Sequence, residues 1–186
     1  MKTKCQKMLS LMAAYVLSVF AQAQTIDWNL LTIVGEEDGT ISNVVDNRYE
    51  FTSERYVLDG PVSNFKFVFK ENYSSNGVSG NDRNGYPWVC ISEFFIYDGD
   101  GNTIELTESC FATNAQESSE GPMANICDDN KTTFWHSTWS SGASDYHYLE
   151  VTLPAGITLS KFCFGWTTRY TTQGNPQTVE VYCSAP

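Results

Sequence analysis

The sequence predicts an all-β protein, an antiparallel β-sandwich or jelly roll, on three observations. Short runs rich in Val, Ile, Phe, Tyr and Thr are separated by clusters of Gly, Asn, Asp and Ser. Residues 64–70 (NFKFVFK) alternate apolar and polar side chains with a period of two, as in a strand with one solvent-facing side. Helix signals are nearly missing after residue 23. Short strands with regular turn signals favour a sandwich.

The remaining strands are expected in order along the chain. Residues 90–98 (CISEFFIYD) run into GDGN, a turn whose glycines tolerate positive φ, and then into residues 103–107, which together predict a hairpin. Three later strands are predicted over residues 147–154, 159–168 and 177–183.

The other segments are expected to serve these strands. Residues 26–59 are expected to supply edge strands to the same sandwich. Residues 71–87 and 113–133 are polar and predict long loops, the first of which we expect not to pack. Loops of this length in a compact domain are usually functional or disordered.

The N-terminus has the pattern of a secretory signal peptide over residues 1–23. Lys2, Lys4 and Lys7 precede an apolar run of 13 residues (MLSLMAAYVLSVF), and AQA supplies a cleavage site after Ala23. The apolar run is too short for a permanent membrane anchor. We therefore expect a secreted or periplasmic protein with one domain over residues 24–186, and no membrane insertion.

The charge balance is acidic, with 22 acidic against 11 basic residues and a net charge of −11, near −14 once the three N-terminal lysines are removed. Nucleic acids and anionic membranes are bound through basic patches, so this balance argues against both as partners. It favours a neutral ligand or a cation.

Five cysteines follow the signal peptide: Cys90, Cys110, Cys127, Cys163 and Cys183. An odd number in an exported protein leaves at least one thiol free or paired with another chain. No C-x-x-C occurs, so zinc and redox chemistry have no support in the spacing. Several of the five lie in apolar strand-like runs, which favours small buried thiols over a full disulfide framework, although the pairing stays open.

The segment DDNKTTFWHSTW, residues 128–139, is the densest concentration of chemistry in the chain. Its first six residues offer carboxylate, amide and hydroxyl oxygens, which are the ligands that calcium prefers. It lacks the spacing of an EF-hand. The alternative is a turn rich in Asp and Asn whose side chains bond their own backbone.

Three segments in order, NICDDNKTTFWHSTW, HYLEVTLP and TTR…GNPQTVEVYCS, resemble the discoidin domain, the C-terminal type of coagulation factors V and VIII. This family belongs to the galactose-binding-domain-like superfamily, with the carbohydrate-binding modules of bacterial enzymes. The resemblance is strongest over residues 91–184. It implies a structural calcium ion held by Ala124 (carbonyl), Asp128, Asn130, Thr133 and Glu180. Asp129 stands where the family usually has Gly.

The resemblance also implies a sugar site in loops at one end of the sandwich. His136, Arg169 and Asn175 match residues that bind sugars in the family, and an aromatic ring is expected to cover the pyranose. The candidates for that ring are Trp139, Tyr146 and Tyr170. By contrast, Trp135 is expected in the core and His147 in a structural role.

No hydrolase signature is present, and two adjacent carboxylates, Asp128 and Asp129, cannot face each other across a glycosidic bond. The sequence thus predicts an exported, non-catalytic module with a structural calcium ion, binding a glycan or cell-surface polysaccharide. The alternative is a protein-interaction or adhesion module of a cell-surface assembly. A glycoside hydrolase is less favoured.

Overall fold

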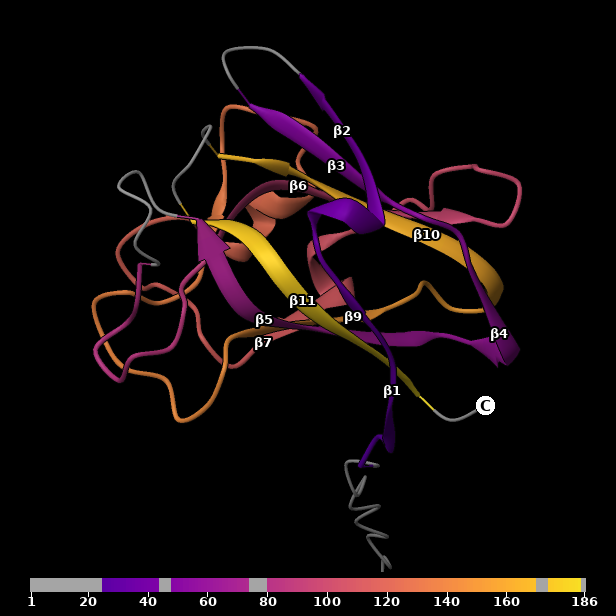
Figure 1. Ribbon diagram of the computed structural model, residues 1–186, viewed down its shortest axis with the longest axis horizontal. Helices are drawn as coiled ribbons and strands as arrows, with labels where there is room; N and C mark the ends of the chain where they lie inside the picture. The colour runs from indigo at the N-terminus through magenta and orange to yellow at the C-terminus, as the bar shows by residue number, and fades with distance from the viewer. Residues whose placement is uncertain (1–24, 44–47, 74–79, 170–173, 185–186) are drawn as a thin grey trace, which may run out of the picture.

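The computed structural model describes residues 25–43, 48–73, 80–169 and 174–184, and over them the chain is a sandwich of two antiparallel β-sheets (Figure 1). Sheet A has the order β1-β11-β5-β9-β7, with bounds Trp28–Val34, Asn175–Ser184, Asn64–Tyr73, Tyr148–Thr152 and Phe111–Thr113. Sheet B has the order β2-β3-β10-β6-β8, with bounds Gly39–Asn43, Tyr49–Ser53, Leu159–Thr168, Cys90–Asp98 and Trp135–His136. Strand β4, Tyr56–Val62, also pairs with β10. The predicted all-β sandwich is confirmed.

Helical structure in the described residues is limited to the short 3₁₀ helices η1 (Glu36–Asp38), η3 (Glu108–Cys110) and η4 (Met123–Ile126). None of the helices in this part of the chain has the length and apolar character needed to cross a membrane. The signal peptide predicted over residues 1–23 lies outside the described residues.

The predicted strands agree closely with the observed ones where the sequence pattern is strongest. Strands β6 and β10 have the predicted bounds. Strand β5 begins at Asn64 as predicted and continues three residues further, to Tyr73, because it stays paired with β11. Strand β9 lies inside the predicted range, and β11 begins two residues early, at Asn175.

The predicted hairpin after β6 forms its turn but not its second strand. The Asp98 carboxylate accepts the backbone N–H groups of Asp100 and Asn102 at 2.9 Å each, and Gly101 has a φ of 88°. After an isolated bridge at Thr103 the chain leaves β6. The strand predicted over residues 103–107 is wrong. The Ile104 backbone N–H still donates to the Ile96 carbonyl at 2.8 Å, but pairing stops there, and the side chains of Ile104 and Leu106 pack against the core.

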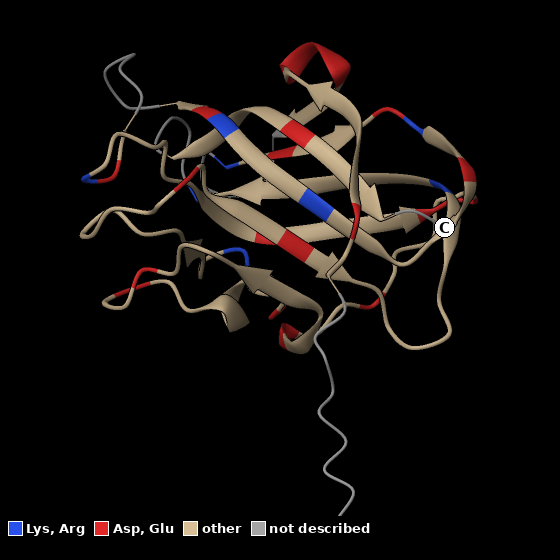
Figure 2. Cartoon of the chain, turned by 90° about the horizontal axis from the view of Figure 1, so that it is seen from below, with Lys and Arg blue, Asp and Glu red and all other residues tan. Residues whose placement is uncertain are grey.

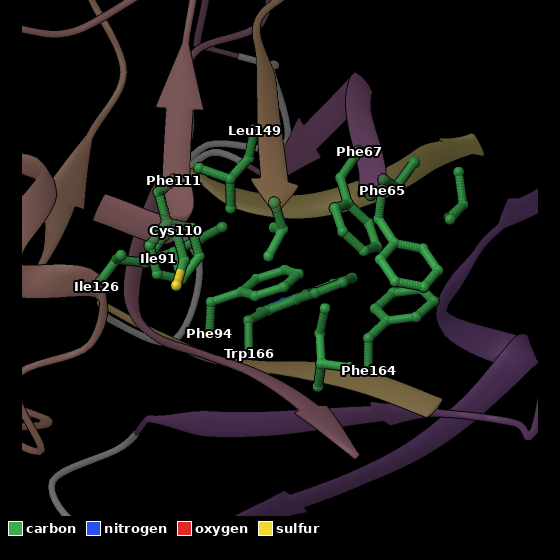
Figure 3. Packing of buried hydrophobic residues seen from close by; sticks show 14 of the residues in the cluster. Phe65, Phe67, Ile91, Phe94, Cys110, Phe111, Ile126, Leu149, Phe164 and Trp166 are labelled. Carbon is green, nitrogen blue, oxygen red and sulfur yellow. The ribbon is translucent and has the colours of Figure 1, made fainter. Parts of the chain in front are cut away.

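The core is built mainly from aromatic side chains facing each other across the two sheets (Figure 3). Alternation along β5 turns Phe65, Phe67 and Phe69 inward, each with 0% exposure. The Phe65 and Phe162 rings lie 4.6 Å apart and the Phe67 and Phe164 rings 4.9 Å apart. Buried residues from both sheets form one cluster, which supplies most of the hydrophobic stabilisation of the fold.

Two tryptophans also belong to this core. Trp135 has 0% exposure, as predicted. Trp166 could have faced either side of β10 from its sequence pattern; in the structure it is 4% exposed and stacks on Phe51 with ring centroids 4.4 Å apart.

The outer face of sheet A is charged, with acidic and basic positions beside each other (Figure 2). Lys66 Nζ lies 3.1 Å from Glu150 Oε1, and Lys70 Nζ lies 3.6 Å from Glu180 Oε1. Partly exposed pairs of this kind contribute at most about 1 kcal/mol each. They keep this face polar.

The N-terminal segment forms edge strands only in part. Strands β1 and β2 are edges of sheets A and B, as expected, whereas β3 lies inside sheet B between β2 and β10. The expectation that residues 71–87 do not pack is wrong for part of the segment, since Asn72 and Asp82 are 3% and 6% exposed. Buried hydrogen bonds, described below, explain why a polar loop can pack here.

Candidate functional site

The segments that precede β6 and surround β8 meet the end of β10 at one end of the sandwich. Cys90, the first residue of β6, pairs with His136 of β8, and Ile91 pairs with both Trp135 of β8 and Thr168 at the end of β10. The polar and aromatic residues next to these positions are therefore brought together, although they are far apart in the sequence.

Trp139, Glu120 and His136 form one contiguous group at this end. Trp139 is 46% exposed, and its indole N–H donates to Glu120 Oε1 at 3.1 Å. The same oxygen lies 3.7 Å from His136 Nε2. Glu120 thus holds an exposed aromatic ring and a buried imidazole on either side of one carboxylate.

His136 itself is 3% exposed, so only its Nε2 side approaches this group. Its Nδ1 lies 2.5 Å from the Ser137 carbonyl. Burial lowers the pKa of His136, and the charge of Arg169 acts in the same direction, while the Ser137 carbonyl and Glu120 oppose them. The sequence predicted that His136 contacts the ligand directly. In the structure its ring is buried beneath the surface residues Glu120 and Trp139.

A buried carboxylate, Glu117, fixes the loop that carries Trp139. Glu117 is 2% exposed and accepts hydrogen bonds from the backbone N–H groups of Trp139 at 3.1 Å and Ser140 at 3.0 Å. It also accepts the hydroxyls of Ser119 and Ser140, at 2.9 and 2.8 Å. Desolvation opposes ionisation, but these donors outweigh it and hold the pKa of Glu117 well below its ordinary range.

Arg169 also lies near His136. Its guanidinium carbon lies 3.7 Å from the centroid of the Phe134 ring, and Nη1 lies 3.9 Å from the Cys90 sulfur. Phe134 and His136 have ring centroids 6.3 Å apart. The structure therefore brings together Trp139, His136 and Arg169 of the predicted ligand-binding set.

The other predicted ligand-binding residues lie elsewhere or outside the described residues. Tyr146 packs edge-on against Tyr86, with centroids 5.3 Å apart, and Lys70 Nζ lies 3.6 Å from its ring centroid. Asn175, 4% exposed, lines a pocket between the sheets with Trp166. Tyr170 lies outside the described residues.

Trp88 is part of the site and was missed from the sequence. Its ring lies 5.0 Å from that of His136, and a Cβ placed on Gly80 or Gly174 would lie 2.5 or 2.3 Å from it. The ring thus occupies space that two distant glycines leave open. The two glycines are the only sequence signal for the position of Trp88. Because Gly80 and Gly174 are far apart in the sequence, that signal could not be recognised.

The turn predicted to bind calcium has the compact geometry of an oxygen-rich turn. The Asp128 carboxylate accepts the Asn130 backbone N–H at 3.0 Å and the Thr133 hydroxyl at 2.8 Å. Asp129 has a φ of 58°, the one positive φ of a non-glycine among the described residues. The position where the resembled family has Gly is therefore left-handed here, which a non-glycine residue adopts only at a cost in free energy.

Glu180, the predicted fifth calcium ligand, is not beside this turn. It lies in β11 of sheet A, where its carboxylate accepts the Tyr182 hydroxyl at 2.9 Å and approaches Lys70. The turn instead packs against β6 of sheet B. The acidic side chain next to it is Glu93, which contacts Asp128 and lines one surface hollow with Ala124 and Asp129.

Glu93 is an unusual carboxylate. It is 3% exposed, and its Oε1 has no hydrogen-bond partner among the described residues. Burial and the neighbouring Asp128 carboxyl raise the pKa of Glu93 to about 7. Among the described residues no group of three or more His, Cys, Asp and Glu side chains has a metal-binding arrangement, so a metal here would also need amide, hydroxyl and carbonyl ligands.

Asp82, His147 and Ser137 form a buried hydrogen-bonded chain. Asp82 Oδ2 lies 3.0 Å from His147 Nε2, and His147 Nδ1 lies 2.8 Å from Ser137 Oγ. Ser137 Oγ also accepts the Val89 backbone N–H at 2.7 Å. The side chains of Asp82 and His147 are both 0% exposed. The Ser137 hydroxyl, the possible nucleophile of this group, is fully buried. The three side chains connect three loops, which agrees with the structural role expected for His147.

The five cysteines form no disulfide among the described residues. Cys90 and Cys110 are buried, and the other three are half-buried. Burial raises the pKa of the Cys90 thiol to about 12, even though Arg169 opposes this. A thiol held protonated in this way is a poor nucleophile and a poor metal ligand.

Comparison with known proteins gives no further identification, since no protein-family model matches the chain and no curated protein matches it.

Proposed function

We propose that the chain is an exported, non-catalytic binding module of discoidin-like type that binds carbohydrate at the loop end carrying Trp139. The observation that carries the proposal is the state of Trp139. Its ring is 46% exposed, yet its indole N–H and its backbone N–H are both held by carboxylates. Large exposed aromatics that are fixed in place are typical of ligand contacts.

The chemistry around this ring suits a neutral polyhydroxyl ligand. An indole face covers the C–H groups of a pyranose, while Glu120 accepts hydroxyl hydrogens beside it. Arg169, half-buried on Phe134, supplies a positive charge near the same end of the sandwich. The acidic balance of the chain also favours a neutral ligand over an anionic one.

A glycan array tests this proposal, with the native protein and a Trp139→Ala variant side by side. We expect retention of at least one glycan by the native protein and its loss in the variant. Trp28→Ala is the matched control, because Trp28 lies on β1 of sheet A and is only partly exposed. Retention of no glycan by the native protein, or equal retention by Trp139→Ala, would reject the sugar proposal.

A structural calcium ion is proposed at the turn of residues 128–133, with Glu93 in the place expected for Glu180. Calcium takes six to eight oxygen ligands, including amides, hydroxyls and carbonyls. Asp128, Asn130, Thr133 and the Ala124 carbonyl are the candidates from the sequence. The buried Oε1 of Glu93 supports the proposal. The Asn130 backbone hydrogen-bonds to the Glu93 carboxylate, but Oε1 itself has no partner among the described residues, and a buried anionic oxygen is costly unless a cation or a proton balances it. The ion would tie the turn to β6.

Thermal unfolding with added calcium and with a chelator tests the calcium proposal. A ligand that binds only the folded state raises stability with its free concentration. We expect calcium to raise the melting temperature of the native protein and of Glu180→Gln, but not of Glu93→Gln. A melting temperature that calcium leaves unchanged in the native protein would reject the site.

A protein-interaction or adhesion module is the second candidate function. The edge strand β1 exposes Leu30 and Ile33, at 53% and 54%, and an edge with exposed apolar side chains can pair with another chain. Concentration-dependent sedimentation tests this candidate. We expect Leu30→Lys to abolish any association through β1, and association that the variant retains would point to another surface.

Export is part of the proposal as well. N-terminal sequencing of protein recovered outside the cytoplasm should begin after Ala23. A mature chain that still begins at Met1 would reject cleavage there.

A further inference from the structure

An aromatic pocket lies between the two sheets, next to the turn that joins β1 to β2. It has a volume of about 280 Å³. Its lining includes Tyr49 and Phe51 of β3, Tyr73 of β5, Trp166 of β10, and the polar residues Glu36 and Gln177. Small-molecule pockets in proteins are roughly 300–1,000 Å³ in volume, so this one suits a small ligand or a single ligand group.

The pocket has a firm aromatic base. Phe51 and Trp166 are each 4% exposed and stack with an interplanar angle of 26°. Tyr49 and Tyr73 are half-buried and approach from sheet B and sheet A respectively. Since strands of both sheets contribute rings, aromatic surfaces border the pocket on more than one side.

The charge of the pocket is negative. Glu36 is the only charged side chain among the described residues that line it. The Tyr73 hydroxyl donates to the Glu36 carboxylate, and burial, this hydrogen bond and the charges of Glu36 and Glu37 raise the pKa of Tyr73 to about 12. Arg48, one position before Tyr49, is not part of the lining. A cation entering the pocket would therefore meet a carboxylate and neutral aromatic rings.

We propose that this pocket binds a small alkylammonium ligand, with the cation over the half-buried rings of Tyr49 and Tyr73 and with Glu36 as its counter-ion. Ring faces carry negative potential and attract ammonium groups within about 6 Å, and methylated ammonium groups are recognised by cages of this composition. Glu36, Glu37 and Asp38 form an acidic η1 helix at the pocket, which disfavours a ligand with a phosphate beside its ammonium group. The inference does not depend on the carbohydrate proposal.

Calorimetric titration of the folded protein with choline tests the proposal. The neutral isostere 3,3-dimethylbutan-1-ol has the same shape without the charge, so we expect it to bind at least roughly tenfold more weakly. Phosphocholine, which represents a lipid headgroup, should also bind more weakly than choline. Equal binding of the neutral isostere, or binding of phosphocholine as tight as that of choline, would overturn the proposal.

Two variants locate the binding. Glu36→Gln keeps the size of an exposed side chain and should weaken choline binding roughly three- to tenfold. Glu105→Gln, the same change at an exposed carboxylate outside the lining, is the matched control and should leave binding within about twofold. Tyr73→Leu should also weaken binding, with its melting curve recorded to confirm folding. No binding of choline by the native protein, or unchanged binding by folded Glu36→Gln, would overturn the assignment.

Discussion

Glu117 accepts the backbone N–H of Trp139 across 22 positions of sequence, at 3.1 Å, so a buried carboxylate determines where the most exposed aromatic ring of the site lies. Charge-assisted hydrogen bonds to backbone N–H groups are stronger than neutral ones. The position of Trp139 therefore depends on the ionisation of a residue that has almost no contact with solvent.

The first prediction concerns acid stability. The pKa of Glu117 is lower in the folded state than in the unfolded state, so its contribution is complete above its ordinary pKa of 4.5 and is lost as the pH falls below it. Glu117→Gln should lower stability at pH 7 by about 1–3 kcal/mol. Thermal melts from pH 7 to pH 3 should show the two proteins converging at low pH. A constant difference across that range would contradict this account.

The second prediction concerns the buried chain of Asp82, His147 and Ser137. Burial lowers the pKa of His147, so its neutral imidazole donates to the buried Asp82 carboxylate. His147→Ala removes this hydrogen bond and leaves a cavity, so it should cost about 3–5 kcal/mol of unfolding free energy. Ser137→Ala should cost less, about 1–3 kcal/mol, because it leaves one backbone N–H and one imidazole nitrogen without a partner. Urea denaturation measures both. A loss below about 1 kcal/mol for His147→Ala would show that the chain contributes little.

The third prediction uses the left-handed residue of the turn. Asp129→Gly relieves the strain of a φ of 58° but increases the freedom of the unfolded chain, so we expect stability to rise by no more than about 1 kcal/mol. Asp129→Val should lower stability by about 1–2 kcal/mol, because β-branched residues tolerate this conformation poorly. Chemical denaturation in the presence of a chelator separates this effect from metal binding. Equal stability of the two variants would contradict the strain.

The fourth prediction compares two glycines with positive φ. Gly174 and Gly156 have φ values of 70° and 84°, but a Cβ would meet the Trp88 ring at 2.3 Å in the first and nothing within 4 Å in the second. Both alanine variants should lose about 1 kcal/mol to backbone strain. Gly174→Ala should lose a further 1–3 kcal/mol, roughly the cost of overpacking, and should change tryptophan fluorescence. Equal losses would mean that Trp88 moves freely.

The sequence predicted the parts of the fold in which one face of a strand is buried. In β5 the alternation of Phe65, Phe67 and Phe69 with polar residues is the direct result of pleating, so both the strand and its core face could be predicted. The absence of a second strand in the hairpin could not be predicted, because residues 103–107 alternate polar and apolar side chains as a strand does. Where pairing stops after Ile104 depends on where the core has space for its side chain and that of Leu106.

The sequence could predict the parts of the site whose interacting residues lie close together in the chain. The turn at Asp128 and its left-handed Asp129 follow from a short segment. Glu93, Glu117 and Trp88 were missed because their partners come from distant loops. Glu93, in the apolar run of β6, was the clearest available signal, since a lone carboxylate in such a run needs a partner.

The pairing of β1 with β11 has a consequence for how the protein acquires its structure. Trp28 lies opposite Ser184, so sheet A joins segments from near the two extremes of the described chain. Contacts of such long sequence separation form slowly, because closing the intervening loop costs conformational entropy before any contact compensates for it. Strand β11 also separates β1 from β5, so β1 has no neighbour in its sheet until β11 has been synthesised. The β1–β11 seam cannot form before then, so we expect it to close late in folding.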